Sequence, residues 1–313
     1  MSLSVSADWK TERESLGQVF ISKPFRLFYD VSGQHALKHQ ADKNHNDVPD
    51  IIENTALQLQ VFHDILNQEL GFMTPFESSR YRNKLQTIDI HFLKSKNRGS
   101  SGDALVRYHY QKVKVATAQS LSIKLSSALT TGNLTPAHEL FRAYANGYTL
   151  FKNRWLTEGT ARWSEYILRK GGGPEKHLPV TYEELKDITE QTYETQYFWN
   201  KLSSVCTVSN STFKSSQWNA LEYIGSSTKV LLDDLIIGSD FIKALFVNLS
   251  LQDAQAAIDL GLPRYDWKEQ QQKSKKNHPY IMRALKHTIE YFSCQNKPEM
   301  QEFVDLLNAY IKK

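Results

Sequence analysis

The sequence predicts an α+β fold, in which a small, mostly antiparallel sheet is followed by a mainly helical C-terminal region. Short runs that alternate apolar and polar residues, typical of half-buried strands, all lie before residue 125. Helical spacing of apolar residues dominates from Tyr182 to the C-terminus. A helix that stops at a glycine run, 171–173, lies between these parts. We therefore place an N-terminal domain at 1–175 and a helical domain at 176–313.

The predicted strands follow one another through the first part of the chain. Residues 25–31 alternate bulky and polar side chains and end at a Ser-Gly turn. Residues 86–93, 104–110, 112–117 and 121–124 are further alternating runs, separated by Gly, Ser and Asn. Together these runs predict the small sheet.

Three helices are predicted around this sheet. Residues 48–70 carry apolar side chains at helical spacing, and Gly71 supplies the end of that helix. A helix over 135–147 is predicted by a Thr-Pro pair at its start and Asn-Gly at its end, because threonine caps a helix and proline suits its first position. A third helix runs over 155–170 and ends at the glycine run 171–173.

Composition and charge exclude several classes of function. The chain has 313 residues, with 38 Lys and Arg against 34 Asp and Glu, and this net charge of +4 is too small and scattered for nucleic-acid binding. No apolar run reaches the length of a membrane span. Cys206 and Cys294 are too few for a disulfide scaffold or a cysteine metal cluster, and the sequence leaves open whether they pair.

A stretch just before the first long helix has oxygen donors at positions 1, 3, 5, 7, 9 and 12 of a twelve-residue loop. These are Asp42, Asn44, Asn46, the backbone carbonyl of Val48, Asp50 and Glu53. This is the calcium spacing of an EF-hand, although position 6, which prefers glycine, is Asp47. An Asx-rich turn that caps the helix explains one or two of these residues but not the alternating set. The sequence therefore predicts a Ca²⁺ site.

The predicted helix over 135–147 carries half of a zinc-binding pattern. His138 and Glu139 match the first two residues of His-Glu-x-x-His, in which two histidines one turn apart bind zinc and the glutamate polarises a metal-bound water. The second histidine is replaced by Arg142, which has no lone pair to give and carries a positive charge. Glu158, sixteen residues further on, is placed to act as a third ligand.

The strings at 137–144 (AHELFRAY) and 155–165 (WLTEGTARWSE) resemble the zinc-binding core of bacterial secreted gluzincin-type metallopeptidases. The calcium-type loop strengthens the resemblance, because members of that group carry a similar stretch before the first long helix. The resemblance implies a metallopeptidase-type active-site helix beside the sheet, with His138 and Glu158 as zinc ligands and Glu139 as general base. Arg142 departs from the family pattern, which makes this a degenerate motif.

The degenerate motif leaves more than one function open. Our main hypothesis is a catalytically inactive pseudoenzyme that binds a peptide or protein, in which Arg142 pairs with Glu139 or Glu158 in place of the metal. The alternative is an active zinc metallopeptidase completed by a substitute third ligand, for which His91, His109 and Tyr148 are the nearest candidates in sequence. Stoichiometric zinc would distinguish the two.

The sequence gives one indication of location. Weak calcium loops suit compartments that are rich in Ca²⁺, so we expect an extracellular or periplasmic protein. A signal peptide is not visible in the sequence, and such a segment is removed from mature proteins.

Overall fold

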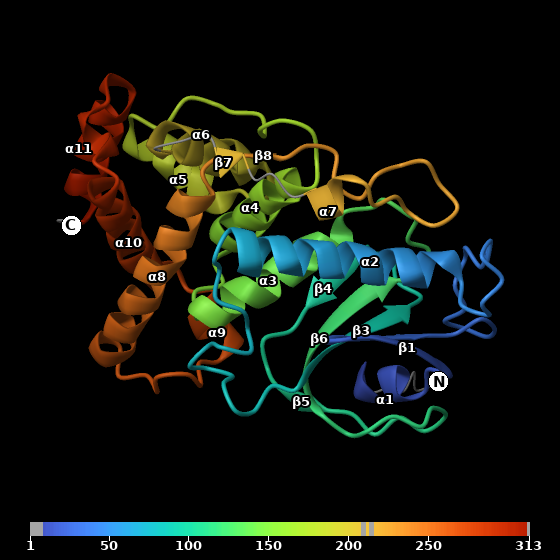
Figure 1. Cartoon of the computed structure of the whole chain (residues 1–313). Coiled ribbons are helices and arrows are strands. Elements are labelled where there is room, and N and C mark those ends of the chain that lie inside the picture. The colour runs from blue at the N-terminus through green and yellow to red at the C-terminus, as the bar shows by residue number, and fades with distance from the viewer. Residues whose placement is uncertain (1–8, 208–210, 213–215, 312–313) are drawn as a thin grey trace, which may run out of the picture. The chain divides into compact units, whose positions relative to one another are not determined.

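The computed structural model describes residues 9–207, 211–212 and 216–311, and it confirms the α+β class (Figure 1). The chain forms two compact units. Unit 1 comprises Met1–Ile65, Thr74–Ala143 and Ala220–Val230, and unit 2 comprises Leu66–Met73, Tyr144–Asn219 and Leu231–Lys313. The domain division predicted from the sequence, 1–175 and 176–313, stays a prediction.

Unit 1 holds the six-stranded sheet and its helices. In chain order these are α1 (Trp9–Glu14), β1 (Gln18–Ser22), β2 (Phe25–Tyr29), α2 (Asp50–Asp64), β3 (Thr87–Leu93), β4 (Gly99–Ser101), β5 (Val106–Arg107) and β6 (Gln119–Ser126). The last element, α3 (Thr135–Tyr148), begins in unit 1 and ends in unit 2.

Unit 2 is mainly helical, as predicted. It contains α4 (Arg154–Ser164), α5 (Tyr182–Glu190), α6 (Gln196–Cys206), β7 (Ser211–Thr212), α7 (Ser216–Asn219), β8 (Leu235–Ile236), α8 (Ser239–Asp259), α9 (Glu269–Gln272), α10 (His278–Tyr291) and α11 (Gln301–Ile311). In the part of the chain that the structure describes, none of the helices combines the length and apolarity that crossing a membrane requires.

The sheet is mixed, with antiparallel outer pairings and parallel pairings at its centre. Its strands run in the order β1-β2-β3-β6-β4, and β5 also pairs with β6. The outer pairings, β1 with β2 and β6 with both β4 and β5, are antiparallel, whereas the two central pairings are parallel. Parallel neighbours need a long crossover, and between β2 and β3 the chain crosses over through α2.

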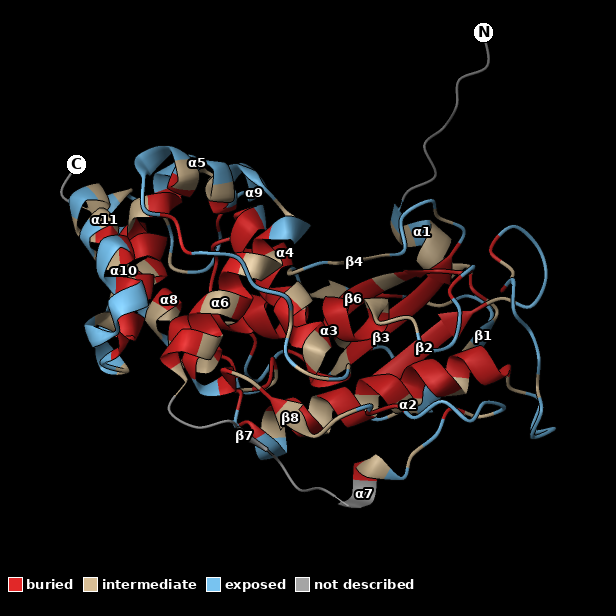
Figure 2. Ribbon diagram, turned by 90° about the horizontal axis from the view of Figure 1, so that it is seen from above, coloured by how far each residue is buried: buried red, intermediate tan, exposed pale blue. Residues whose placement is uncertain are grey.

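Each face of the sheet is covered by a different part of unit 1, because side chains alternate along a strand. On β2, Phe25 meets His63 of α2 edge to face, with ring centroids 5.6 Å apart. Phe28, three residues later on β2, points to the other face of the sheet and stacks on Tyr110, with ring centroids 3.7 Å apart. Tyr110 belongs to the cover segment, residues 102–118, which links β4 to β6. Figure 2 shows the resulting burial of the central strands.

The cover segment replaces two strands that the alternation predicted. Of the runs 104–110 and 112–117, only β5 is a strand. Glu14 takes up backbone N–H groups that a strand ladder would use, because its carboxylate accepts from His109 N at 2.8 Å and its carbonyl accepts from Gln111 N at 3.1 Å. The alternation of bulky residues here reflects tyrosines that pack on the sheet face, not a strand.

A buried ion pair joins β2 and β3 under the cover segment. Arg26 donates from Nε and Nη2 to the two carboxylate oxygens of Asp89 at 2.7 and 2.6 Å, and from Nη1 to the carbonyl of Ala116. Tyr110 donates its hydroxyl to Asp89 Oδ2 at 2.9 Å. Asp89 is fully buried, and these hydrogen bonds hold β2, β3 and the cover segment together.

One disulfide, Cys206–Cys294, closes a loop within unit 2, across a sequence separation of 88 residues. It ties the end of α6 to the turn that follows α10. The helix predicted to run to residue 170 is shorter, because α4 ends at Ser164 and is followed only by a 3-10 turn, Glu165–Ile167. The glycine run lies beyond this turn, and Gly171 adopts a φ of +71°, which residues with a side chain rarely take.

Candidate functional site

The helix with the degenerate motif starts at Thr135, as the Thr-Pro pair predicts, and ends at Tyr148, one residue past Gly147. Its first turn is held by Asn133, whose Oδ1 accepts from the Thr135 N–H at 3.0 Å and from the Thr135 hydroxyl at 2.7 Å. The side chain that caps the helix is therefore Asn133, two residues earlier than predicted. This cap fixes the direction in which the helix leaves the preceding turn.

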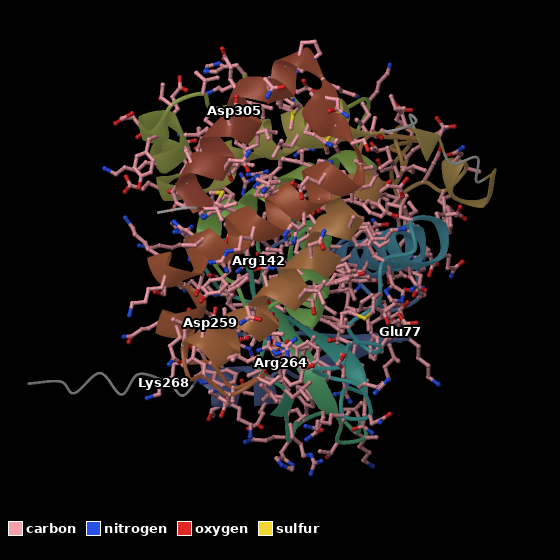
Figure 3. All side chains as sticks on the ribbon, turned by 90° about the vertical axis from the view of Figure 1, so that its left-hand side faces the viewer. Glu77, Arg142, Asp259, Arg264, Lys268 and Asp305 are labelled. Carbon is pink, nitrogen blue, oxygen red and sulfur yellow. A yellow bond between two sulfur atoms is a disulfide. The ribbon has the colours of Figure 1, made fainter. Side chains whose placement is uncertain are left out.

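Arg142 forms an ion pair with Glu139, one of the two carboxylates that the sequence offered as its partner. Arg142, labelled in Figure 3, donates from Nη1 to Glu139 Oε2 at 3.1 Å. The same oxygen accepts a hydrogen bond from the Ser101 hydroxyl at 2.8 Å. Glu139 is only 4% exposed, so these two donors take the place of water as its hydrogen-bond partners.

The first turns of α3 pack directly on β4. A Cβ atom added to Gly99 would lie 2.4 Å from Thr135 Cγ2 and 3.0 Å from Glu139 Cγ, which is too close for any residue but glycine. No side chain of β4 at this position can therefore stand between the strand and Glu139. Sequence reasoning missed Gly99 and Ser101, because a three-residue strand of Gly-Ser-Ser reads as a turn.

β4 pairs with β6 along one edge only. Arg98 accepts from Ser126 N at 2.8 Å and Gly102 donates to Ser122 O at 2.9 Å, so the even-numbered residues direct their backbone groups toward β6. The intervening residues, Gly99 and Ser101, direct theirs to the outer edge of the strand. An extended peptide can pair with such an edge by adding a strand.

One of the positions that would bind zinc in the family pattern carries a cation instead of a ligand. On α3, His138 is buried at 6% exposure, and the position one turn later carries the guanidinium of Arg142, which repels a cation. Glu158 lies on α4, in unit 2, and is 5% exposed. Among the described residues, no three His, Cys, Asp or Glu side chains form a group that could hold a metal. The zinc prediction stays a prediction.

The substitute ligands considered from the sequence have other partners. His91 is fully buried, with Nε2 2.8 Å from the Tyr110 hydroxyl and Nδ1 3.3 Å from Ser122 Oγ. Burial lowers the pKa of His91 well below its usual value, which keeps the ring neutral. The hydroxyl of Tyr148 accepts from Met73 N at 2.6 Å, within unit 2. His109 is exposed on the cover segment.

The calcium-type loop is folded in unit 1, and three of its predicted ligands come together. Asn44 and Asn46 donate their side-chain amides to the two carboxylate oxygens of Glu53, at 3.1 and 2.8 Å. Asp42 accepts from Asn46 N at 3.2 Å and from Asp47 N at 2.9 Å. A half-turn of the Asn44 amide would present oxygen to a cation in place of nitrogen. The Asn46 Oδ1 accepts from Val48 N at 3.0 Å, so a half-turn of that amide would also break this hydrogen bond.

The departure at position 6 is accommodated by the backbone. Asp47 adopts a φ of +67°, the left-handed conformation for which an EF-hand uses glycine, and aspartate tolerates it better than most residues. Asp50 differs from the other predicted ligands, because its Oδ1 accepts from Lys43 N at 3.0 Å and its side chain is buried. Asp42, Asn44, Asn46 and Glu53 can all offer oxygen, the donor that Ca²⁺ prefers, but only two of the four are carboxylates. The Ca²⁺ site therefore also stays a prediction.

Comparison with known proteins gives no relative, since no family model, curated protein or solved structure matches the chain. The geometry of α3, β4 and the calcium-type loop is therefore the basis for the functional argument.

We expect Ca²⁺ to stabilise unit 1. A ligand that binds only the folded loop at 100 times its Kd adds about 2.7 kcal/mol to the free energy of unfolding. Thermal unfolding with added Ca²⁺ or with chelator measures this gain. Glu53→Gln should abolish it, whereas Glu69→Gln, which removes an exposed carboxylate after α2, should keep it. An equal gain with Mg²⁺, or in Glu53→Gln, would contradict the site.

Proposed function

We propose that the chain is a non-catalytic, metallopeptidase-like protein that binds extended peptides. The observation that supports this most is the occupation of Glu139 Oε2 by Ser101 and Arg142. In a gluzincin-type site the general base acts on a water that zinc polarises, whereas the charged partner of Glu139 here is the Arg142 guanidinium, which donates hydrogen bonds but cannot bind a water as a metal does. The Arg142 cation supplies the charge balance that a metal would otherwise provide.

The outer edge of β4 supports an extended peptide as the ligand. Gly99 and Ser101 direct backbone donors and acceptors outward, and a peptide that pairs with them gains main-chain hydrogen bonds of about 1 kcal/mol each. Because Gly99 has no side chain, the added strand would lie close to α3. Recognition through the backbone favours no particular sequence, so the proposed ligand class is broad.

A Ca²⁺ ion in the loop from Asp42 to Glu53 and a location outside the cytoplasm belong to the same proposal. Oxidising compartments are where disulfides form and persist, and the pair Cys206–Cys294 supports such a location. Extracellular Ca²⁺ is abundant enough to occupy a weak loop.

Peptide binding can be tested with a phage-displayed library of random peptides. We expect enriched peptides to bind the unmodified protein and Ser101→Ala equally well to within a few-fold. Ser101→Pro should weaken binding about tenfold, because proline removes the outward N–H at this position. Ser101→Ala is the matched control, since both variants lose the hydroxyl that contacts Glu139. Retention of full affinity by Ser101→Pro would contradict strand addition.

The same samples test the alternative of an active enzyme. Elemental analysis of protein purified without chelators is expected to find less than stoichiometric zinc, and enriched peptides are expected to remain intact. Stoichiometric zinc together with peptide cleavage would contradict the non-catalytic proposal and favour a metallopeptidase whose zinc site is completed by another protein ligand.

A further inference from the structure

One segment of unit 1 comes from far along the chain. After Ala143 the chain belongs to unit 2, and it returns to unit 1 only at Ala220–Val230, here called the return segment. Figure 1 shows this segment in orange, beside the N-terminal end of α2. It is a tight antiparallel turn, in which Tyr223 donates to Thr228 O and Val230 donates to Leu221 O, both at 3.0 Å. Its tip, 225–229, is exposed.

Two buried amides of α2 hold the base of the return segment. The Asn54 side chain accepts from Ile224 N at 2.7 Å and donates to Ile224 O at 3.1 Å. It thus makes the same pair of backbone hydrogen bonds that an adjacent strand would make. Gln58, one turn later, donates to the Tyr223 hydroxyl at 2.7 Å. Asn54 directly follows Glu53, the last residue of the calcium-type loop.

The calcium-type loop itself holds the tip. Lys43 Nζ donates to Gly225 O at 2.7 Å, and the Lys43 backbone N–H is fixed by Asp50. Gly225 has a φ of +71°, and a Cβ there would lie 2.6 Å from Lys43 Cδ and 3.0 Å from Asp50 Oδ2. A side chain at position 225 would therefore require the Lys43 and Asp50 side chains to move.

This contact is polar and only partly filled. A pocket lies between the loop, the turn at Thr131 and the return segment, with Lys43, Asp50 and Gly225 among its walls. A few hydrogen bonds rather than a dry apolar core thus hold the tip. A segment held by a few polar contacts detaches locally with a small free-energy change. A ligand that orders one side of the contact shifts the equilibrium toward the attached state.

We infer that Ca²⁺ in the loop from Asp42 to Glu53 controls how firmly the return segment is docked on unit 1. The inference rests on the proposed calcium site. Lys43 stands between the predicted ligands Asp42 and Asn44, so a bound cation fixes the backbone from which the lysine reaches Gly225. If undocking requires the loop to lose its ordered form, Ca²⁺ at 100 times its Kd lowers the open population about 100-fold.

Hydrogen exchange followed by mass spectrometry tests the coupling in the full chain. We expect Ca²⁺, compared with chelator, to slow exchange over 220–230 by at least tenfold. Gly225→Ala should exchange rapidly there in both conditions, while Ca²⁺ still protects residues 42–53 and raises the melting temperature. Gly33→Ala is the matched control, because Gly33 has a φ of +82° but nothing within 4 Å of an added Cβ. This variant should keep the coupling.

The outcomes separate the coupling from the calcium site. Protection of 42–53 by Ca²⁺ without any change at 220–230 overturns the coupling and leaves the site intact. An absence of any effect of Ca²⁺ overturns both. Loss of the coupling in Gly33→Ala as well as in Gly225→Ala also overturns it, because a general loss of stability, and not the contact with Lys43, would then explain the result.

Discussion

Removal of the disulfide Cys206–Cys294 is expected to destabilise unit 2 by about 4–5 kcal/mol, because the bond closes a loop of 88 residues in the unfolded chain. Both cysteines are 1% exposed, so the paired sulfurs also fill core volume. The double variant Cys206→Ala/Cys294→Ala and the reduced unmodified protein both test this, with denaturant unfolding as the measurement.

The reductant also provides the control. It should lower the free energy of unfolding of the unmodified protein and leave that of the double alanine variant unchanged. A loss below about 1 kcal/mol on reduction would mean that unit 2 holds the two ends together without the bond, and that the closed loop contributes little.

Asp89→Ala is expected to cost unit 1 about 3–5 kcal/mol, since it leaves the guanidinium of Arg26 buried without its carboxylate. The Arg26 side chain is 6% exposed, so water cannot take over. The Tyr110 hydroxyl loses an acceptor in the same variant. Urea unfolding measures the loss, and the cover segment should show the largest increase in hydrogen exchange.

Two comparisons show whether the buried charge is the cause. The double variant Arg26→Met/Asp89→Leu leaves no unpaired charge buried. We expect it to regain a large part of the free energy of unfolding that Asp89→Ala loses. Glu290→Ala, which breaks an exposed pair with Lys286 on α10, should cost less than about 0.5 kcal/mol. A double variant as unstable as Asp89→Ala would show that packing, rather than the lone guanidinium, dominates.

Local signals in the sequence predicted much of the fold. The helical spacing over 48–70 is realised as α2 and a π-helical turn, Ile65–Glu69, and Gly71 follows with a φ of +66°. The alternation over 86–93 is realised as β3. In each case the residues that decide the structure lie within a few turns of one another, where propensity and periodicity operate.

Contacts between distant residues were not predictable in this way. The pairing of Arg142 with Glu139 follows from their spacing on one helix, but Ser101 reaches the same carboxylate across 38 residues. The tyrosines of the cover segment alternate like a strand because they pack on His91 and Phe28. Nothing local in the sequence indicates that Ile224 would serve as the partner of Asn54.

The return segment also has a consequence for biosynthesis. Lys43 and Gly225 are 182 residues apart, so at roughly 5–20 residues per second a ribosome makes the second about 10–35 s after the first. From the synthesis of residue 126 onward, the nascent chain holds every strand of the sheet and α2 but lacks the last piece of unit 1. The side-chain amides of Asn54 and Gln58 then remain hydrated, and completion of this unit waits for translation of most of the chain.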